Sequence, residues 1–406
     1  MLINAIYFNA VIVALLLLAG WIELGGKWKV PLVYYFIVLM FAWSGNRFNG
    51  ADWINYSKYY EVLGGVGNLF DALQQSPFEW LISAWMWALS HTGLPYEGMV
   101  FSVALVNTSC ILWFVKQTQV RSVGAALAIL YLSEGWFLYH EQLREALAVS
   151  VCFIAYVRFL DRKYFSALFI VFLAFGLHNS AFFALLIFYV LWSVKRRDNA
   201  PLPVTRLFVL SILFAGFIAV FVVFGEFSIF SAVGLGRLQE KYVYYAGNNY
   251  GQSLFTGGLL AYPLCFAVLM LFRKQVVNKR NRWASVSWSL AVLWCLIGPW
   301  LRTIAILTRF EHYLLIFIPF ACAYYPGDIK PKRDLVYGMR QLPMLVFSAT
   351  FFVRIVISPE YSTWVNDYQN VYLSEGFPGV IRELEPQQNR YDFICNNLSL
   401  YNNFCE

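Results

Sequence analysis

Four polar residues at the borders of long apolar segments carry side chains suited to acid–base and anion chemistry: Asp52, Arg144, His178 and Arg309. A carboxylate or an imidazole at such a border is partly desolvated and can accept a proton near neutral pH. A guanidinium can bind phosphate oxygens, because its planar fork of N–H donors matches their geometry. The four residue types together predict a site that deprotonates a hydroxyl and stabilises an anion.

Two of these residues also have a purely structural interpretation. Asp52 follows an apolar segment directly and could cap a short helix. His178 ends the run FLAFGLHNSAFFALL, which predicts a helical hairpin with its turn at Asn179 and Ser180. A lone histidine in such a run is more often a packing residue than a catalyst.

The arginines have a structural interpretation as well. Arg144 opens a predicted helix, where an unpaired charge at the apolar boundary costs roughly 2.5–3.5 kcal/mol. An internal ion pair with Glu141 or Glu145 would offset that cost, and Arg309 could likewise pair with Glu311. The alternative to both pairs is an anionic ligand.

A further set of residues could bind a sugar diphosphate. Arg237 and Lys241 are four residues apart and share a helical face beside Tyr242, although this segment could equally be a solvated amphipathic lid. The residues predicted to bind substrate are Arg47, Tyr56, Arg237, Lys241, Tyr242, Arg302, His312 and Tyr313.

The elements that must position these residues are apolar helices. A chain of 406 residues that is 60% hydrophobic and 13% charged, with a mean hydropathy of +0.58, is typical of a polytopic membrane protein. We expect an all-α fold with about 12–13 transmembrane helices, in which 78–92 is a re-entrant or interfacial helix. One transmembrane domain would cover 1–358, with outer loops at 46–77 and 226–253, followed by an extracytoplasmic tail at 359–406. The apolar segments are 2–22, 30–45, 78–92, 98–115, 123–139, 143–160, 164–178, 180–194, 205–225, 254–272, 284–301, 310–325 and 341–358.

The charges sort these segments into two sides. Basic residues gather in alternate gaps, such as 195–197 and 273–282, which the positive-inside rule assigns to the cytoplasm. Twenty basic and five acidic residues then lie inside, whereas ten basic residues, 18 acidic residues and all four histidines lie outside. Any chemistry is therefore predicted at the extracytoplasmic face.

Several function classes are disfavoured. The net charge of +7 is the sum of the two unequal faces and does not indicate nucleic-acid binding. The sequence contains no Walker loop, HExxH motif or cysteine-rich metal motif, so we expect no tightly held metal or nucleotide and no cofactor. Cys395 and Cys405 could form a disulfide if the tail is extracytoplasmic. Five other cysteines lie in apolar runs and are predicted to be inert packing residues, at 110, 152, 265, 295 and 322.

The order of short motifs resembles a known family. Gly50-x-Asp52-x-x-x-Tyr56 and Pro77-x-Glu79 come first, followed by Arg-Glu-Ala-Leu-Ala at 144–148 and a cytoplasmic Asp-Arg-Lys turn. His-x-Ser-Ala at 178–181 and Arg-x-x-x-Tyr at 309–313 complete the series. Over about residues 45–325 the chain resembles the EpsG-like family of bacterial exopolysaccharide and O-antigen polymerases, the Wzy-type enzymes.

The resemblance implies a GT-C-like glycosyltransferase in the bacterial inner membrane with its active site facing the periplasm. Its partners would be undecaprenyl-diphosphate-linked oligosaccharides, membrane lipid and a chain-length regulator. Asp52, Arg144, His178 and Arg309 would be the essential residues, with Asp52 or His178 as the base. The alternatives are a flippase for lipid-linked oligosaccharides and a transferase that adds a single sugar or ligates a chain to lipid A. Apolar mid-span stretches such as 207–224 favour an enzyme over a flippase.

Overall fold

In the computed structural model every regular element is a helix among the residues that it describes, which are 5–25, 28–45, 53–135, 137–226, 228, 243, 261–271, 273, 277, 281–302 and 305–323. No strand occurs in these ranges. Together with the apolar composition of the helices, this confirms the predicted all-α polytopic membrane fold. The five cysteines predicted to be packing residues are buried and unoxidised.

Most helices coincide with predicted apolar segments, but two, Trp53–Gly64 and Leu69–Gln75, lie within the predicted outer loop 46–77. The helices are α1 (Ala5–Leu24), α2 (Leu32–Ser44), α3 (Trp53–Gly64), α4 (Leu69–Gln75), α5 (Trp80–Ser90), α6 (Tyr96–Thr118), α7 (Val123–Leu130), η1 (Tyr131–Gly135), η2 (Phe137–Glu141), α8 (Leu143–Leu160), α9 (Tyr164–Leu177), η3 (Asn179–Phe183), α10 (Ala184–Lys195), α11 (Val204–Glu226), α14 (Ala261–Leu271), α16 (Arg282–Leu301), α17 (Ala305–Leu315) and α18 (Phe317–Cys322).

Local sequence signals explain where several helices begin. Asn68 and Ser122 cap α4 and α7, because their side-chain oxygens accept a hydrogen bond from a backbone N–H of the first turn. The predicted segment 123–139 is not one regular helix. It continues from α7 into two π-helical turns, η1 and η2, which lead to α8. Such π turns are rare and frequently occur at functional sites.

Three of the described helices are long and apolar enough to cross a membrane: α6, α16 and the Val204–Phe224 part of α11. Seven further apolar helices are shorter. The helix α5 has 11 residues and therefore a length of about 16 Å, against a hydrocarbon core of about 30 Å. That length suits the re-entrant or interfacial helix expected at 78–92. The predicted segment 341–358 lies outside the described residues, and the count of 12–13 crossings stays a prediction.

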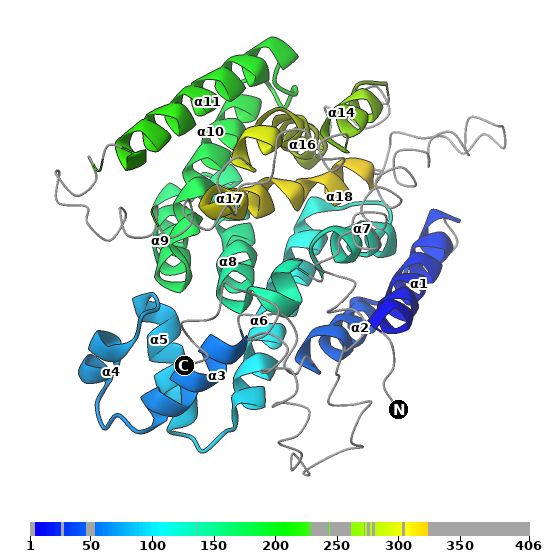
Figure 1. The fold of residues 1–406 in the computed structure, drawn as a ribbon. Coiled ribbons are helices and arrows are strands. Elements are labelled where there is room, and N and C mark those ends of the chain that lie inside the picture. Colours follow the sequence, from blue (N-terminus) through cyan, green and yellow to red (C-terminus); the bar gives the residue numbers. More distant parts are fainter. Residues whose placement is uncertain are drawn as a thin grey trace.

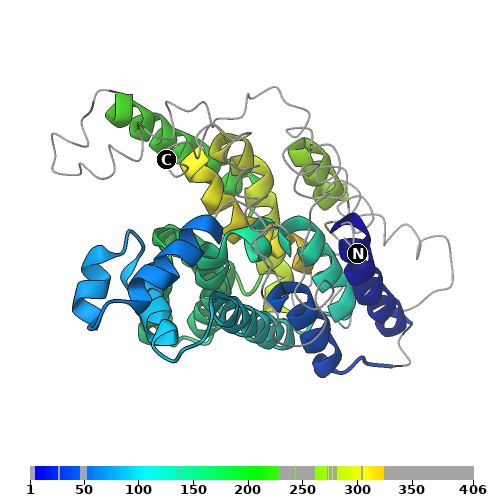
Figure 2. The same cartoon turned by 60° about the horizontal axis from the view of Figure 1, so that its bottom comes forward.

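The bundle is centred on α8, which packs against α6, α9, α10 and the short turns η2 and η3 (Figure 1). The helices α3, α4 and α5 form a separate group beside one end of this centre in both views (Figures 1 and 2). Elsewhere α1 crosses α7 at very short range, and a Cβ at Gly124 would lie 2.4 Å from the backbone nitrogen of Gly20. Only glycine permits this approach, because the obstructing atoms belong to the other helix's backbone.

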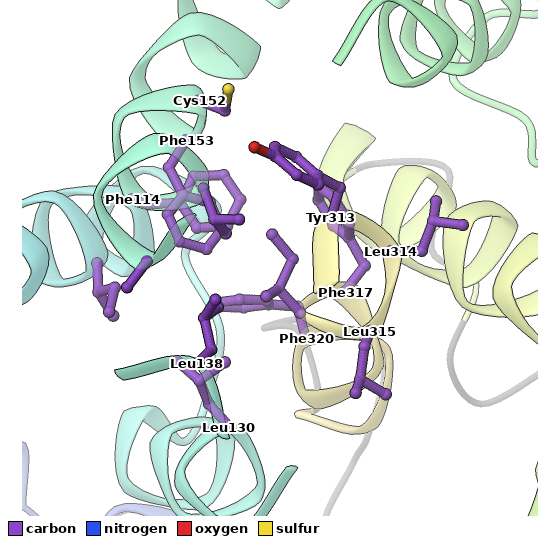
Figure 3. Packing of buried hydrophobic residues seen from close by; sticks show 14 of the residues in the cluster. Phe114, Leu130, Leu138, Cys152, Phe153, Tyr313, Leu314, Leu315, Phe317 and Phe320 are labelled. Carbon is purple, nitrogen blue, oxygen red and sulfur yellow. The ribbon is translucent and has the colours of Figure 1, made fainter. Parts of the chain in front are cut away.

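Aromatic rings join the two halves of the chain in the core. Phe114 of α6 stacks on Phe153 of α8, with their ring centroids 4.4 Å apart. The Phe114 ring is nearly perpendicular to Phe317 and Phe320 of α18, with ring centroids 6.3 and 5.0 Å apart. Figure 3 shows these side chains in the core. These contacts place α17 and α18 beside α8 and so position Arg309 and Tyr313.

The structure keeps the two charge-sorted sets of segments apart. At the C-terminal end of α8, Asp161 accepts a 2.6 Å hydrogen bond from Arg282, and Lys195 donates to the Leu160 carbonyl at 2.8 Å. All of these residues were predicted to lie inside. The other end of α8 begins at Leu143, roughly 27 Å away by the helical rise. There the residues predicted to lie outside gather.

Candidate functional site

The first part of the site is an ion pair between α5 and α8. Arg144 Nη1 donates a 2.6 Å hydrogen bond to Glu79 Oε2, while Arg144 Nε donates to the Tyr56 hydroxyl at 3.3 Å. The guanidinium carbon lies 4.5 Å from the centroid of the Phe78 ring. A charge-assisted hydrogen bond, a phenol and an aromatic face therefore fix the orientation of Arg144.

Glu79 reaches this position because α5 lies directly against α9. Trp80 covers Gly176 so closely that a Cβ there would lie 2.5 Å from the indole ring. The second carboxylate oxygen, Glu79 Oε1, accepts a hydrogen bond from the backbone N–H of Asn179 at 3.3 Å. Glu79 thus joins Arg144 to the turn that carries His178.

The second part of the site is a network around His178, where α9 ends and the backbone becomes extended. Arg309 Nη1 lies 2.8 Å from His178 Nε2 and 3.7 Å from Glu145 Oε2. Ser180 Oγ lies 2.6 Å from His178 Nδ1 and donates to Glu145 Oε1 at 3.0 Å. The Tyr313 hydroxyl is 3.1 Å from Ser180 Oγ. One network therefore joins α8, the predicted hairpin turn and α17.

Two adjacent ion pairs involve residues of the same surroundings. His312 Nδ1 is 2.7 Å from Glu134 Oε2, whose side chain is fully buried in η1. Arg302 donates to both carboxylate oxygens of Glu311 at 3.2 and 3.3 Å. Glu311 also accepts hydrogen bonds from Tyr262 Oη and Trp294 Nε1, at 2.8 and 3.1 Å.

The structure thus brings three of the four essential candidates together: Arg144, His178 and Arg309. Tyr56 and Tyr313 belong to the same cluster, whereas His312 and Arg302 lie in their own acid–base pairs. The remaining candidates lie outside the described residues: Arg47, Asp52, Arg237, Lys241 and Tyr242. The same holds for the tail at 359–406, for Cys395 and Cys405, and for almost all of the outer loop at 226–253.

Both arginines form ion pairs, but with other partners than the sequence suggested. Arg144 pairs with Glu79, 65 positions away, whereas the sequence suggested Glu141 or Glu145. Arg309 lies against Glu145 and His178, and Glu311 pairs with Arg302. Sequence spacing favours partners within one helical turn, so it could not identify these long-range partners.

Two buried carboxylates, Glu145 and Glu134, are the acidic partners of Arg309 and His312 in these networks. The sequence indicates Glu145 only as a local partner for Arg144 and as part of the motif at 144–148, and it assigns no role to Glu134. Both side chains are 0% exposed. A usable signal existed for Glu134, since it is the one acidic residue within the apolar run 123–139, and a charge there requires a partner.

The site offers two cations and an imidazole at one end of the bundle. The side chains of Arg144 and Arg309 are 16% and 23% exposed, so neither arginine is fully enclosed. Glu145 and His178 lie behind them, with His178 only 6% exposed. The arrangement can bind an anion at its surface and hold a proton acceptor just beneath it.

Comparison with known proteins gives one result for most of the chain. The model of the EpsG family matches residues 30–370. Neither the curated proteins nor the solved structures contain a match. The match covers far more than half of the sequence and includes every described member of the site, so this membrane protein belongs to the EpsG family.

Proposed function

We propose that the protein is a glycosyltransferase that polymerises oligosaccharide repeat units carried on undecaprenyl diphosphate. It would act at the periplasmic face of the bacterial inner membrane and build O-antigen, capsule or exopolysaccharide. The observation that carries this proposal is the meeting of Arg144, Arg309 and His178 at one end of α8, with both arginine side chains partly exposed. Membership of the EpsG family supports it.

The chemistry suits these residues. An acceptor sugar hydroxyl attacks the anomeric carbon of the growing chain, and the bond to the lipid diphosphate breaks. Arg144 and Arg309 would stabilise the negative charge of the departing diphosphate in a site that partly excludes water. Asp52 or His178 would accept the hydroxyl proton. No cofactor takes part in this scheme.

The periplasmic orientation rests on the charge distribution. The opposite end of α8 carries the basic residues that the positive-inside rule assigns to the cytoplasm, including Arg282 and Lys195. The substrates would be lipid-linked oligosaccharides within the membrane, and a chain-length regulator is a further expected partner. Nucleic acid has no part in the proposal.

Replacement of Arg144 tests the proposed function. In a host that lacks its own polymerase, Arg144→Ala should yield lipid bearing a single repeat unit in place of a ladder of long chains, visible on a gel. Loss of one donor to the developing charge lowers such rates by roughly 10²–10³-fold. The matched control is Arg282→Ala, whose ion pair has the same 2.6 Å length at the opposite end of α8.

Normal ladders from a well-inserted Arg144→Ala protein would contradict the proposal. The alternatives give different products. Loss of a flippase would leave the repeat-unit lipid on the cytoplasmic side, where a periplasmic lectin cannot reach it. Loss of a single-sugar transferase would shorten the repeat unit itself, which mass spectrometry of the glycolipid detects.

A further inference from the structure

We propose that His178 is the base of this reaction, that Ser180 and Glu145 orient it, and that Arg309 covers its reactive nitrogen until a diphosphate draws the guanidinium away. The inference rests on the proposed function and deepens it. It selects one of two candidate bases and adds two positioning residues. It also makes deprotonation of the acceptor conditional on the presence of the donor.

The contact between Arg309 and His178 fixes which imidazole nitrogen carries the proton. A guanidinium has only donors, so Arg309 Nη1 at 2.8 Å requires a lone pair on His178 Nε2. A neutral imidazole has one N–H group, which must then be on Nδ1. A doubly protonated ring would place two donors face to face and is disfavoured.

The Nδ1–H group has an acceptor in place. Ser180 Oγ lies 2.6 Å from Nδ1 and donates a hydrogen bond to Glu145 Oε1 at 3.0 Å. The chain therefore runs from imidazole to hydroxyl to carboxylate, and it ends on a side chain that is 0% exposed. Tyr313 contacts the same hydroxyl at 3.1 Å and limits its rotation. This arrangement holds the tautomer that a general base needs and would stabilise the imidazolium that forms.

The tautomer of His178 must stay the same after Arg309 has moved. The backbone N–H of Ser180 also approaches His178 Nδ1, at 3.2 Å. A hydrogen bond there would require a lone pair on Nδ1 and a proton on Nε2, and Nε2 could then not accept the hydroxyl proton. The shorter 2.6 Å contact with Ser180 Oγ, which donates to Glu145, must therefore keep the proton on Nδ1.

Arg309 is placed to leave. Its distance to Glu145 Oε2 is 3.7 Å, which is long for an ion pair, and its side chain is 23% exposed. A diphosphate offers a guanidinium stronger bidentate contacts than an imidazole does. Once Arg309 turns to the diphosphate, Nε2 can take the proton of the acceptor hydroxyl. The oxygen then forms the new bond to the anomeric carbon, and the electron pair of the broken bond leaves on the diphosphate.

Replacement of Ser180 tests whether the hydrogen bonds from His178 through Ser180 to Glu145 orient the base. Ser180→Ala should slow the formation of glycolipid with two or more repeats by roughly 10²-fold in membranes of the deletion host, because the base loses its orientation. Ser180→Thr keeps the hydroxyl and should retain most of the rate. The control is Ser211→Ala, an equally buried serine that donates to the Leu296 carbonyl. Equal rates for Ser180→Ala and Ser180→Thr would contradict the proposal that Ser180 links His178 to Glu145 and orients it.

Chemical rescue identifies the base. His178→Gly should form no polymer alone and should regain it when imidazole is added to the membranes, whereas Asp52→Gly should not respond. A merely structural histidine gives no such rescue. If the His178→Gly protein inserts normally but imidazole restores nothing, or if it polymerises without imidazole, His178 is not the base.

Carbethoxylation of histidine tests whether Arg309 covers His178 Nε2, and it does not require an active enzyme. Diethyl pyrocarbonate attacks an accessible neutral imidazole, and mass spectrometry resolves His178 from the exposed His91, which serves as the internal reference. If the uncovered state is a minor one, Arg309→Ala should raise the relative rate at His178 roughly tenfold or more. Inorganic pyrophosphate should raise it in the unaltered protein. Absence of either increase would contradict the proposal that Arg309 covers His178 Nε2 until a diphosphate binds.

The proposed function can fail separately. If Arg144→Ala keeps long chains, the polymerase proposal falls. If Arg144→Ala abolishes them while Ser180→Ala and His178→Gly do not, the polymerase stands and only this inference is lost.

Discussion

Two arginine–glutamate groups at the same end of the bundle use the same residue types for different purposes. Arg302 and Glu311 are 8% and 5% exposed, and the carboxylate also accepts hydrogen bonds from Tyr262 and Trp294. Arg309 reaches Glu145 at 3.7 Å and is 23% exposed. The first group is buried and its carboxylate accepts several hydrogen bonds, whereas the second has a longer Arg–Glu distance and a more exposed arginine. Residue type alone therefore does not indicate a site.

The physical difference is what a ligand would have to displace. An anion that approached Arg302 would have to break a desolvated pair, which leaves a buried carboxylate without its counter-charge. An anion that approaches Arg144 or Arg309 meets side chains that are already 16% and 23% exposed. We therefore regard Arg302 chiefly as a residue that fixes α17 relative to α16, and its predicted contact with substrate stays a prediction.

The largest expected effect is on stability, at the buried pair of Arg302 and Glu311. Glu311→Ala should lower the free energy of unfolding by about 3–5 kcal/mol, because it leaves a buried guanidinium unpaired. Thermal unfolding of the detergent-solubilised protein measures this loss. The double replacement Arg302→Met with Glu311→Leu should recover only part of it, because Tyr262 Oη and Trp294 Nε1 still lose their acceptor. A double variant that is stable yet makes no polymer would show that Arg302 does contact substrate.

Next in size is an effect on activity, at the more exposed arginine. Arg309→Ala should reduce chain formation by roughly 10²–10³-fold, because a cation that opposes the diphosphate charge is lost. The melting temperature should change far less than in Glu311→Ala. The rate of glycolipid formation, compared with thermal unfolding of the same preparation, checks this contrast. A large loss of stability would place Arg309 with the buried pair.

A smaller effect is expected at the partner of Arg144. Glu79→Gln keeps the shape of the side chain but removes its charge, so Arg144 loses a charge-assisted hydrogen bond worth about 1.5–3 kcal/mol. Polymerisation should fall roughly 10- to 100-fold, as measured by the ladder of chain lengths. An unchanged ladder would show that Tyr56 and Phe78 orient Arg144 without the carboxylate.

The smallest effect is expected at the exposed pair on the opposite end. Arg282 and Asp161 are 37% and 39% exposed, and such pairs contribute only about 0–1 kcal/mol. Asp161→Asn should therefore leave both the melting temperature and the chain length close to those of the unaltered protein. A strong loss of polymer would show that the two ends of the bundle are coupled.

The order of short motifs predicted part of the candidate site but not the partners of its charged residues. Arg144, His178 and Arg309 were identified from short motifs and from their predicted placement on one face, and the structure brings them together. The Pro77-x-Glu79 motif includes Glu79 but does not indicate that this residue joins α5 to both α8 and the His178 turn. The buried partners Glu145 and Glu134 depend on contacts across 35 to 178 positions of sequence. No local spacing rule identifies contacts of that range.

The amino-acid sequence by itself determined that the chain is helical and lies in a membrane, and it sorted the charges between two faces. Those properties follow from composition and from the alternation of basic gaps with apolar runs, which are local quantities. Only the tertiary structure decided which arginine is buried and which is partly exposed, and which nitrogen of His178 faces a cation. These outcomes depend on how α8, α16 and α17 pack together, because burial and hydrogen-bond partners are properties of the assembled bundle.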